Sequence, residues 1–232
     1  MPRQIATTSR RRVAGGERLS RERIVATAIE VADRDGIDSL SMRKLAQRLG
    51  VDPMSLYNHV HDKDDLLSGI VDGLVTQIEP VTDGTDWLTS LRQTILAARQ
   101  TLLRHPWSSR VIESRVTPTP ATLRYLDTVL GIMRDGGFSL QLRHHTLHVL
   151  GSRILGFSQD LFDDSPDVRP PPEVAAMQAA MWATTHPDLA LLAGAVTHDG
   201  GLGGCDDDEE FAFSLDLILE GLEKRRLREL QL

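Results

Sequence analysis

Between Ser41 and Lys63 the sequence concentrates side chains that can hydrogen-bond to phosphates and to the edges of nucleic-acid bases. Arg43 carries a planar guanidinium fork, which matches the paired acceptors of guanine in the major groove of DNA. Lys44, Arg48 and Lys63 suit phosphate oxygens, contacts that position a protein on DNA without specifying its sequence. The other candidates are Met54, Ser55 and Asn58 for base edges or sugars, and Tyr57 and His59 for phosphate oxygens. Each of these residues could instead be a solvated surface side chain.

The elements that would position these side chains are two short helices joined by a turn. Ser41 can cap the first helix, and Gly50 is expected to end it because glycine tolerates a left-handed backbone. The inward side of this helix is apolar and consists of Leu45, Ala46 and Leu49. Asp52 and Pro53 are a typical cap and first position of a second helix, over about residues 53–59. This pattern is typical of a helix-turn-helix, whose second helix enters the major groove. A generic αα-hairpin is the alternative.

A helix on each side of this pair completes a domain over residues 19–80. Ser20 can cap the preceding helix, and Gly36 lies just past its end. Asp62 can cap the following helix, which should stop near Pro80. Both helices carry apolar residues at helical spacing: Ile24, Ala28, Val31 and Ala32 in the first, and Leu66, Leu67, Ile70 and Leu74 in the second. Residues 1–18 are rich in arginine without apolar periodicity, and we expect a flexible basic arm there.

The remaining chain, residues 85–232, is predicted to form a helical body. Helices are expected over residues 87–104, 107–114, 120–135, 140–161, 173–185, 189–196 and 209–228, with prolines and glycines between them. No segment shows the convincing period-two alternation of a β-strand. The sequence therefore predicts an all-α protein, in which a three-helix helix-turn-helix DNA-binding domain is joined to a helical bundle.

Charge is distributed unevenly along the chain, whose formal net charge is −7. Residues 1–63 contain 12 Lys and Arg against 8 Asp and Glu, whereas residues 64–232 contain 14 against 25. A cationic module attached to an acidic body suits DNA binding in which the body avoids non-specific contact. The sequence has no apolar run of 18 residues and no signal peptide at its arginine-rich start, so we expect a cytoplasmic protein without membrane contact. The single cysteine, Cys205, cannot form an internal disulfide.

Three histidines in the predicted helix 140–161 raise the alternative of a metal-dependent enzyme. His144 and His148 lie one helical turn apart, with His145 beside them, so two imidazoles could share a metal ion. The spacing imitates the HExxH motif of zinc hydrolases but lacks its glutamate, and a third ligand is not evident nearby. We therefore expect histidines of a pocket or an interface, with no metal, cofactor or catalytic residue.

Residues 20–75 resemble the DNA-binding domain of the TetR family of repressors. The resemblance rests on residues 36–46 (Gly-Ile-Asp-Ser-Leu-Ser-Met-Arg-Lys-Leu-Ala), 49–51 (Leu-Gly-Val), 55–60 (Ser-Leu-Tyr-Asn-His-Val) and 62–67 (Asp-Lys-Asp-Asp-Leu-Leu). It implies DNA contacts from Ser41, Arg43, Met54, Ser55, Tyr57, His59 and Lys63. Asn58 departs from the family, which often has an aromatic residue at this position.

The body resembles the ligand-binding and dimerising domain of the same family, through Trp87, residues 136–140 (Gly-Gly-Phe-Ser-Leu) and the order of its helices. The resemblance implies a cavity for a small-molecule effector among the helices of residues 87–161. Candidate lining residues are Leu103, Trp107, Met133, His148 and Phe157, each of which could instead be ordinary core packing. Glu79 and Glu113 align with two histidines by which tetracycline repressors hold a drug–magnesium chelate, so a different effector is expected.

A homodimer on a palindromic operator is expected, because one helix-turn-helix contacts few base pairs. The resemblance implies that two late helices of each subunit form a four-helix bundle at the interface. Here they are residues 140–161, where Ser152 and Gly156 permit close approach, and residues 209–228. The candidates in the second helix are Phe211, Leu215, Ile218 and Leu222, which could instead fill the core of one subunit.

These features together predict a transcriptional regulator, by family default a repressor that a small-molecule effector releases from its operator. Such an effector must bind two conformations of the dimer with different affinities, since only that difference can shift the population between them. Two alternatives remain: the metal-dependent enzyme, and an architectural DNA-binding protein without an effector site.

Overall fold

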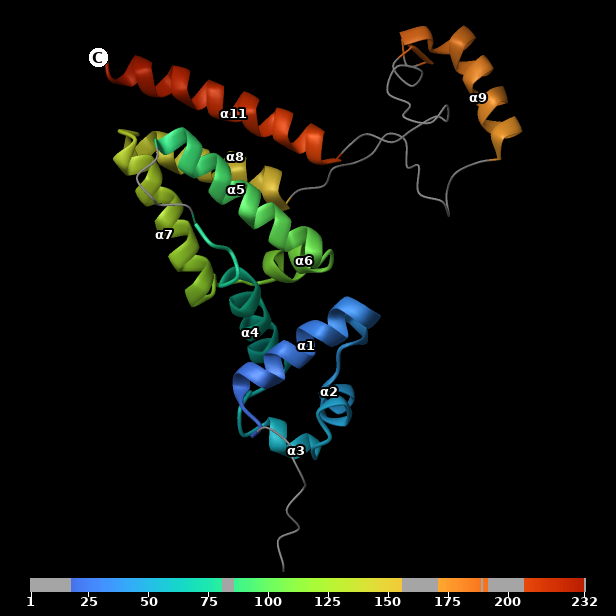
Figure 1. Ribbon diagram of the computed structural model, residues 1–232, viewed down its shortest axis with the longest axis vertical. Coiled ribbons are helices and arrows are strands. Elements are labelled where there is room, and N and C mark those ends of the chain that lie inside the picture. The colour runs from blue at the N-terminus through green and yellow to red at the C-terminus, as the bar shows by residue number, and fades with distance from the viewer. Residues whose placement is uncertain (1–17, 81–85, 156–170, 189, 192–206, 232) are drawn as a thin grey trace, which may run out of the picture. The chain divides into compact units, whose positions relative to one another are not determined.

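The computed structural model describes residues 18–80, 86–155, 171–188, 190–191 and 207–231, and every regular element in these ranges is a helix (Figure 1). The predicted all-α fold is confirmed. Contacts along the chain define two compact units, one from residues 1–77 and 104–123 and the other from residues 78–103 and 124–232. None of the described helices is both long and apolar enough to cross a membrane.

The first unit contains the predicted helix-turn-helix. Its helices are α1 (Arg21–Asp35), α2 (Met42–Leu49), α3 (Pro53–Leu56), α4 (Lys63–Val75) and α6 (Ser108–Glu113), with a short 3-10 turn at Ile37–Ser39 (Figure 1). All four predicted caps are confirmed, because Ser20, Ser41, Asp52 and Asp62 each accept a hydrogen bond from a backbone N–H in the helix that follows. Gly50 ends α2 with a left-handed backbone, at φ 68°. The helix expected over residues 53–59 is shorter and ends at Leu56.

The core of this unit is formed by the apolar sides of α1, α2 and α4. Its buried residues include Ile24, Ala28 and Val31 of α1, Leu45 and Ala46 of α2, Leu56 of α3, and Leu66, Ile70 and Leu74 of α4. Helices α1 and α4 pack closely at Gly69, where an added Cβ would lie 2.9 Å from the Cγ2 of Val25. A glycine is therefore needed there to keep the two helices at this distance.

Residues 104–123 belong to the first unit because aspartates from the N-terminal helices hold them. Asp33 lies at the carboxyl end of α1, where its Oδ1 accepts a hydrogen bond from Trp107 Nε1 at 2.8 Å and lies 2.7 Å from His105 Nδ1. The other three contacts are Arg110 to Asp38 at 2.6 Å, Arg115 to Asp64 at 2.6 Å, and the backbone N–H of Ala121 to Asp72 at 2.8 Å. The first compact unit therefore consists of two separate stretches of chain, and the domain boundary expected near residue 80 stays a prediction.

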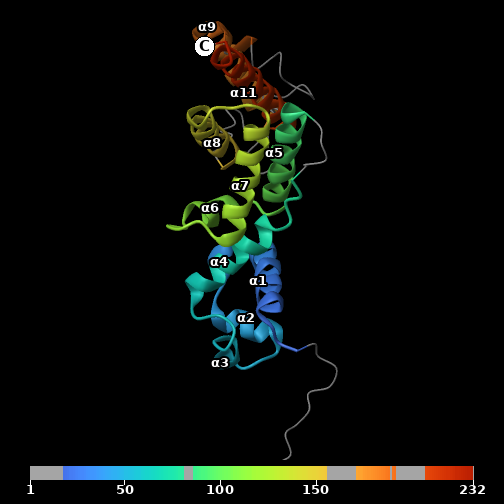
Figure 2. The same ribbon diagram turned by 90° about the vertical axis from the view of Figure 1, so that its left-hand side faces the viewer.

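The second unit is built around one apolar core. Its helices are α5 (Trp87–Arg104), α7 (Pro120–Asp135), α8 (Leu140–Leu155), α9 (Pro172–Thr185) and α11 (Asp207–Glu229), although the last residue of α5 and the first four of α7 belong to the first unit. Helices α5 and α7 lie next to each other in Figure 2. The core contains Leu91 and Ile95 of α5, Val129 and Met133 of α7, Leu142 and Leu150 of α8, and Phe211, Leu215, Leu219 and Leu222 of α11.

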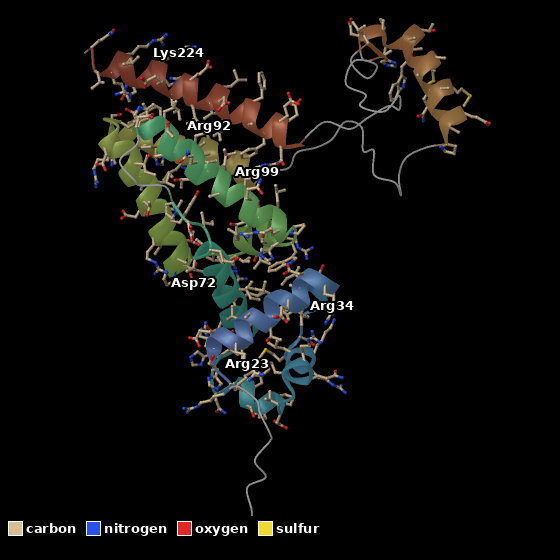
Figure 3. All side chains as sticks on the ribbon, in the orientation of Figure 1. Arg23, Arg34, Asp72, Arg92, Arg99 and Lys224 are labelled. Carbon is tan, nitrogen blue, oxygen red and sulfur yellow. The ribbon has the colours of Figure 1, made fainter. Side chains whose placement is uncertain are left out.

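Ion pairs and a close aromatic contact fix α11 and the turn after α7. Arg92 and Arg99 extend from α5 towards α11 (Figure 3), where they pair with Asp216 at 2.7 Å and Asp208 at 3.0 Å. Gly136 is in close contact with Trp87, since an added Cβ would lie 2.6 Å from the Cβ of the tryptophan. The sequence resemblance included both residues of this contact.

The predicted helix boundaries of this part are close to the observed ones. Helices 87–104 and 120–135 are confirmed at both ends. The ends of α6, α9 and α11 lie within two residues of the predicted ones. The helix expected over residues 140–161 is described to Leu155, and its remainder lies outside the described residues. The predicted helix 189–196 and the basic arm of residues 1–18 also fall almost entirely outside them.

Candidate DNA interface

The outer sides of α2 and α3, together with the turn after α3, carry most of the residues expected to contact DNA. Met54 is 71% exposed, and Arg43, Tyr57 and Asn58 are also exposed. Ser55 and His59 are half-buried. The inner sides of the same two helices are buried through Leu45, Ala46 and Leu56. The fold thus presents polar and flexible side chains outward from a rigid support, an arrangement that suits contact with a groove of DNA.

The basic residues of this region differ in how they are paired. The Lys44 ammonium lies 2.8 Å from Asp35 and donates a hydrogen bond to the Ser39 hydroxyl at 3.1 Å, so it is already engaged within the unit. Hydrogen bonds from Arg34 and Lys44 hold the pKa of Asp35 well below its usual range. Arg43, Arg48 and Lys63 are exposed and form no ion pair with any described residue. These three need no rearrangement to contact an anion, whereas Lys44 would have to leave Asp35.

Ser41 has a structural role that the resemblance did not imply. Its side-chain oxygen accepts a hydrogen bond from the Lys44 backbone N–H at 3.2 Å and so begins α2. The hydroxyl can still donate its own proton, since a serine hydroxyl both accepts and donates. Ser41 is exposed, so a contact with a phosphate remains geometrically open.

An arginine clamp, formed by Arg21 and Asp65, holds the segment that follows α3 and was not predicted from the sequence. Arg21 donates two hydrogen bonds to the Asp65 carboxylate, at 2.6 and 2.9 Å, and a third to the carbonyl oxygen of His59 at 3.1 Å. The same carboxylate accepts from the His61 backbone N–H at 2.8 Å. The hydrogen bond from Arg21 is the main cause that lowers the pKa of Asp65 to about 2. The clamp therefore fixes the backbone beside Tyr57, Asn58 and His59.

The residues expected to line an effector cavity differ in their surroundings, and their role stays a prediction. Met133 is buried in the core of the second unit, whereas Leu103 and His148 are exposed. Trp107 belongs to the first unit and donates to Asp33. Phe157 lies outside the described residues. Core packing was the alternative for each of these residues, and Met133 is packed in the core.

Two grooves lie on the described part of the chain, and none of the four described candidates, Leu103, Trp107, Met133 and His148, lines either of them. One, of about 690 Å³, runs along α5 and α7 and is lined by Trp87, Asp127 and Ile132 among others. The other, of about 380 Å³, runs along α1 and α4 and is lined by Val25, Ile29 and Gly73 among others.

Burial also reassigns most of the residues expected at a dimer interface. Phe211, Leu215 and Leu222 are buried in the core of their own chain, and Ile218 packs against that core. The exposed apolar residues of α11 lie on its other side, with Phe213 at 61% and Leu217 at 55% exposure. Ser152 of α8 is exposed and donates to the carbonyl of His148, and Gly156 lies outside the described residues. Helix α11 is thus apolar on two sides, and the residues predicted for the dimer interface lie on the side that faces the core of their own chain.

The three histidines of α8 form a cluster of rings on its exposed side. The ring centroids of His144 and His148 are 4.7 Å apart, and those of His144 and His145 are 5.6 Å apart. Within the part of the chain that the structure describes, no group of three or more His, Cys, Asp or Glu side chains is arranged to hold a metal ion. The geometry therefore gives the metal-dependent enzyme no support.

Two protein families match successive parts of the chain. Residues 24–70 match the family described as bacterial regulatory proteins, tetR family, and residues 79–226 match the tetracyclin repressor-like C-terminal domain. An HTH-type transcriptional regulator of Saccharopolyspora erythraea is 36% identical over 121 residues, 52% of this chain and 51% of that protein, so the chain spans about half the length of this relative. The HTH-type transcriptional repressor DrrR1 of Streptomyces coeruleorubidus is 30% identical over 217 residues, 88% of this chain and 77% of the repressor.

Solved structures agree with this assignment along most of the chain. Apo ActR of Streptomyces coelicolor superposes with a TM-score of 0.72 at 26% identity, covering 93% of this chain and all of that one. ActR in complex with actinorhodin gives a TM-score of 0.70 at 27% identity, covering 90% of this chain and 99% of that one. Both the order of the helices and the fold of the units are therefore those of known regulators.

Proposed function

The chain belongs to the tetR family of bacterial regulatory proteins, and on this premise we propose that it represses transcription by binding an operator and leaves the operator when a small molecule binds it. The observation that carries the proposal is the arrangement of α2 and α3, whose inner sides are buried and whose outer sides expose Arg43, Met54, Tyr57 and Asn58. Such an arrangement can place side chains in the major groove without disturbing the core that supports them.

Each residue of the interface has a proposed role. Arg43 donates to paired acceptors on guanine, and Met54, Ser55 and Asn58 contact base edges or sugars. The phosphate contacts are formed by Tyr57, His59, Lys63 and the Ser41 hydroxyl, with Lys44 able to join them if it leaves Asp35. The Arg21–Asp65 clamp touches no DNA in this proposal and acts by positioning the turn after α3.

We propose a homodimer that joins through the exposed sides of α8 and α11. The support is the pair Phe213 and Leu217, which are one helical turn apart and exposed although they are large and apolar. On α8 the exposed residues His148 and Ser152 are also one turn apart. A second copy of the chain covering these sides would place two helix-turn-helix elements on the half-sites of a palindrome.

The dimer is tested by its oligomeric state. Replacing both Phe213 and Leu217 by glutamate should convert a dimer to a monomer in analytical ultracentrifugation, because charges would be buried at an apolar contact. Leu123→Glu is the matched control, since Leu123 is 55% exposed but belongs to the first unit, and it should leave the dimer intact. A double variant that still sediments as a dimer would show that the interface does not include Phe213 and Leu217.

We propose that the effector is a polycyclic aromatic compound with carbonyl and hydroxyl groups. The support is the likeness to ActR, whose solved structures include a complex with actinorhodin, a compound of this class. The matches that place this chain with DrrR1 and ActR are to regulators and not to enzymes, so we propose neither catalysis nor the architectural role. A repressor acts where the chromosome is, which in bacteria is the cytoplasm.

Selection of bound duplexes from a random pool tests the DNA-binding part of the proposal. An inverted repeat should emerge, and actinorhodin should then release the protein from it with the dimer intact. Retention of unrelated sequences with equal affinity would support the architectural alternative. Operator binding that no polycyclic compound changes would contradict the proposed regulation.

A further inference from the structure

Tyr125 of α7 carries a hydroxyl group that is buried and has no hydrogen-bond partner. The side chain packs against the apolar core of the second unit, and burial raises the pKa of its phenol. A buried hydroxyl without a partner destabilises a fold, because it has lost its hydrogen bonds to water and gained none from the protein. Such a group calls for a specific explanation.

The other buried hydroxyls of the second unit show how this problem is usually solved. Thr101 and Thr146 donate to backbone carbonyls one turn earlier in their own helices, at 3.1 and 2.7 Å. Ser90 and Thr94 are also buried, and neither is without a partner. Among the described residues of this unit, Tyr125 is thus the one whose buried hydroxyl is left unpaired. A phenol cannot fold back onto its own helix as serine and threonine do, so its partner must come from elsewhere.

We propose that the Tyr125 hydroxyl donates a hydrogen bond to a carbonyl or phenolic oxygen of the effector and is thereby a specificity-determining residue of the effector site. This inference rests on the proposed function, which supplies the class of ligand. Tyr125 lines neither of the two grooves described above and packs against the core, so in this proposal the ligand opens the core around it. The free energy of that opening lowers the apparent affinity, and satisfying the hydroxyl partly offsets it.

The unpaired hydroxyl also favours the complex over the ligand-free protein. In the ligand-free protein the group destabilises the closed core, whereas in the complex it is satisfied. This difference contributes to the affinity of the protein for a ligand that carries a hydrogen-bond acceptor. Polycyclic compounds that lack an acceptor near this position gain only apolar contact, and so they should bind less tightly.

The test compares Tyr125→Phe with the native protein, using actinorhodin as the probe and no DNA. Phenylalanine removes the hydroxyl and keeps the ring, so the core should keep its packing. We expect the ligand-free variant to melt about 2–4 °C higher, because an unsatisfied polar group is gone. We expect its affinity for actinorhodin, measured by calorimetry, to fall about tenfold, because the hydrogen bond is lost.

Thr146→Val is the matched control. It also removes a buried hydroxyl, but one that is already bonded within its helix, and it should leave the affinity for actinorhodin unchanged. Unchanged affinity in Tyr125→Phe overturns the inference, and so does a lower melting temperature, which would show that the hydroxyl is paired in the free protein. Failure of actinorhodin to bind the native chain overturns the ligand class and the inference with it. Binding that depends on Tyr125 but does not release operator DNA would instead refute only the proposed regulation.

Discussion

The Arg21–Asp65 clamp allows a sharp test of how the DNA-binding unit is held together. Replacing Arg21 by methionine keeps the aliphatic stem and removes the donors to Asp65 and to the His59 carbonyl. The pKa of Asp65 is lowered from an ordinary 3.8 to about 2, which corresponds to at most about 2.5 kcal/mol of stability at neutral pH. Because Arg21 is 38% and Asp65 25% exposed, solvent screening reduces this to about 1–2 kcal/mol.

A double-mutant cycle measures this interaction directly. Urea unfolding at pH 7 of the native protein, Arg21→Met, Asp65→Asn and the double variant should give a coupling free energy of about 1–2 kcal/mol. The folded state lowers the pKa of the carboxylate, so the coupling is complete above about pH 4 and is lost as the pH falls through about 2. In Arg21→Met the pKa of Asp65, followed by NMR, should rise towards its ordinary value.

Arg43→Met is the matched control for this change. It removes an exposed guanidinium that forms no ion pair with a described residue, so stability should stay within about 0.5 kcal/mol of the native value while operator affinity falls. Arg21→Met should lower both, since the turn after α3 loses its support. If the coupling were below about 0.3 kcal/mol, or if both variants were equally stable, the clamp would not hold this turn.

Three further comparisons of variants test other parts of the structure. Arg43→Ala should reduce the preference for the operator over random DNA by about 1–3 kcal/mol. Lys63→Ala should weaken binding to all sequences and reduce by about one the slope of log affinity against log salt concentration. Binding assays at several salt concentrations that gave equal effects on operator and random DNA for both variants would contradict both roles. Gly69→Ala should lower the free energy of unfolding by about 1–3 kcal/mol in urea, because its Cβ would meet Val25, while Gly221→Ala, with open space around it, should be neutral or slightly stabilising. Asp33→Asn should weaken its bonds to the 104–123 segment and cost about 1–3 kcal/mol in the same assay.

The parts of the fold that were predicted correctly depend on short-range interactions. Each cap joins residues at most three positions apart, as Ser20 does with Arg23 and Asp62 with Asp65, so its signal lies within a few letters of sequence. Glycine in a left-handed conformation at position 50 is equally local. The helix-turn-helix could therefore be predicted in detail from residue types alone.

The missed features depend on interactions between distant residues. Arg21 and Asp65 are 44 positions apart, and Asp33 and Trp107 are 74 apart, so neither pair leaves a periodic pattern in the sequence. The interface residues predicted in α11 are buried for another reason. This helix is apolar on the side of Phe211 and Leu215 and also on the side of Phe213 and Leu217. Periodicity shows that both sides are apolar, but only tertiary packing decides which of them the chain itself covers.

The discontinuity of the first unit has a consequence for hybrid regulators. A transplant that exchanged only residues 1–77 for those of a relative would leave the resident 104–123 segment facing foreign side chains. Arg110 and Arg115 would then lose their bonds to Asp38 and Asp64, and Trp107 would lose its bond to Asp33. These bonds would persist only if the relative that supplies the segment had carboxylates at the same positions. A transfer of DNA specificity therefore needs further junctions near residues 104 and 123, so that residues 1–77 and 104–123 are exchanged together.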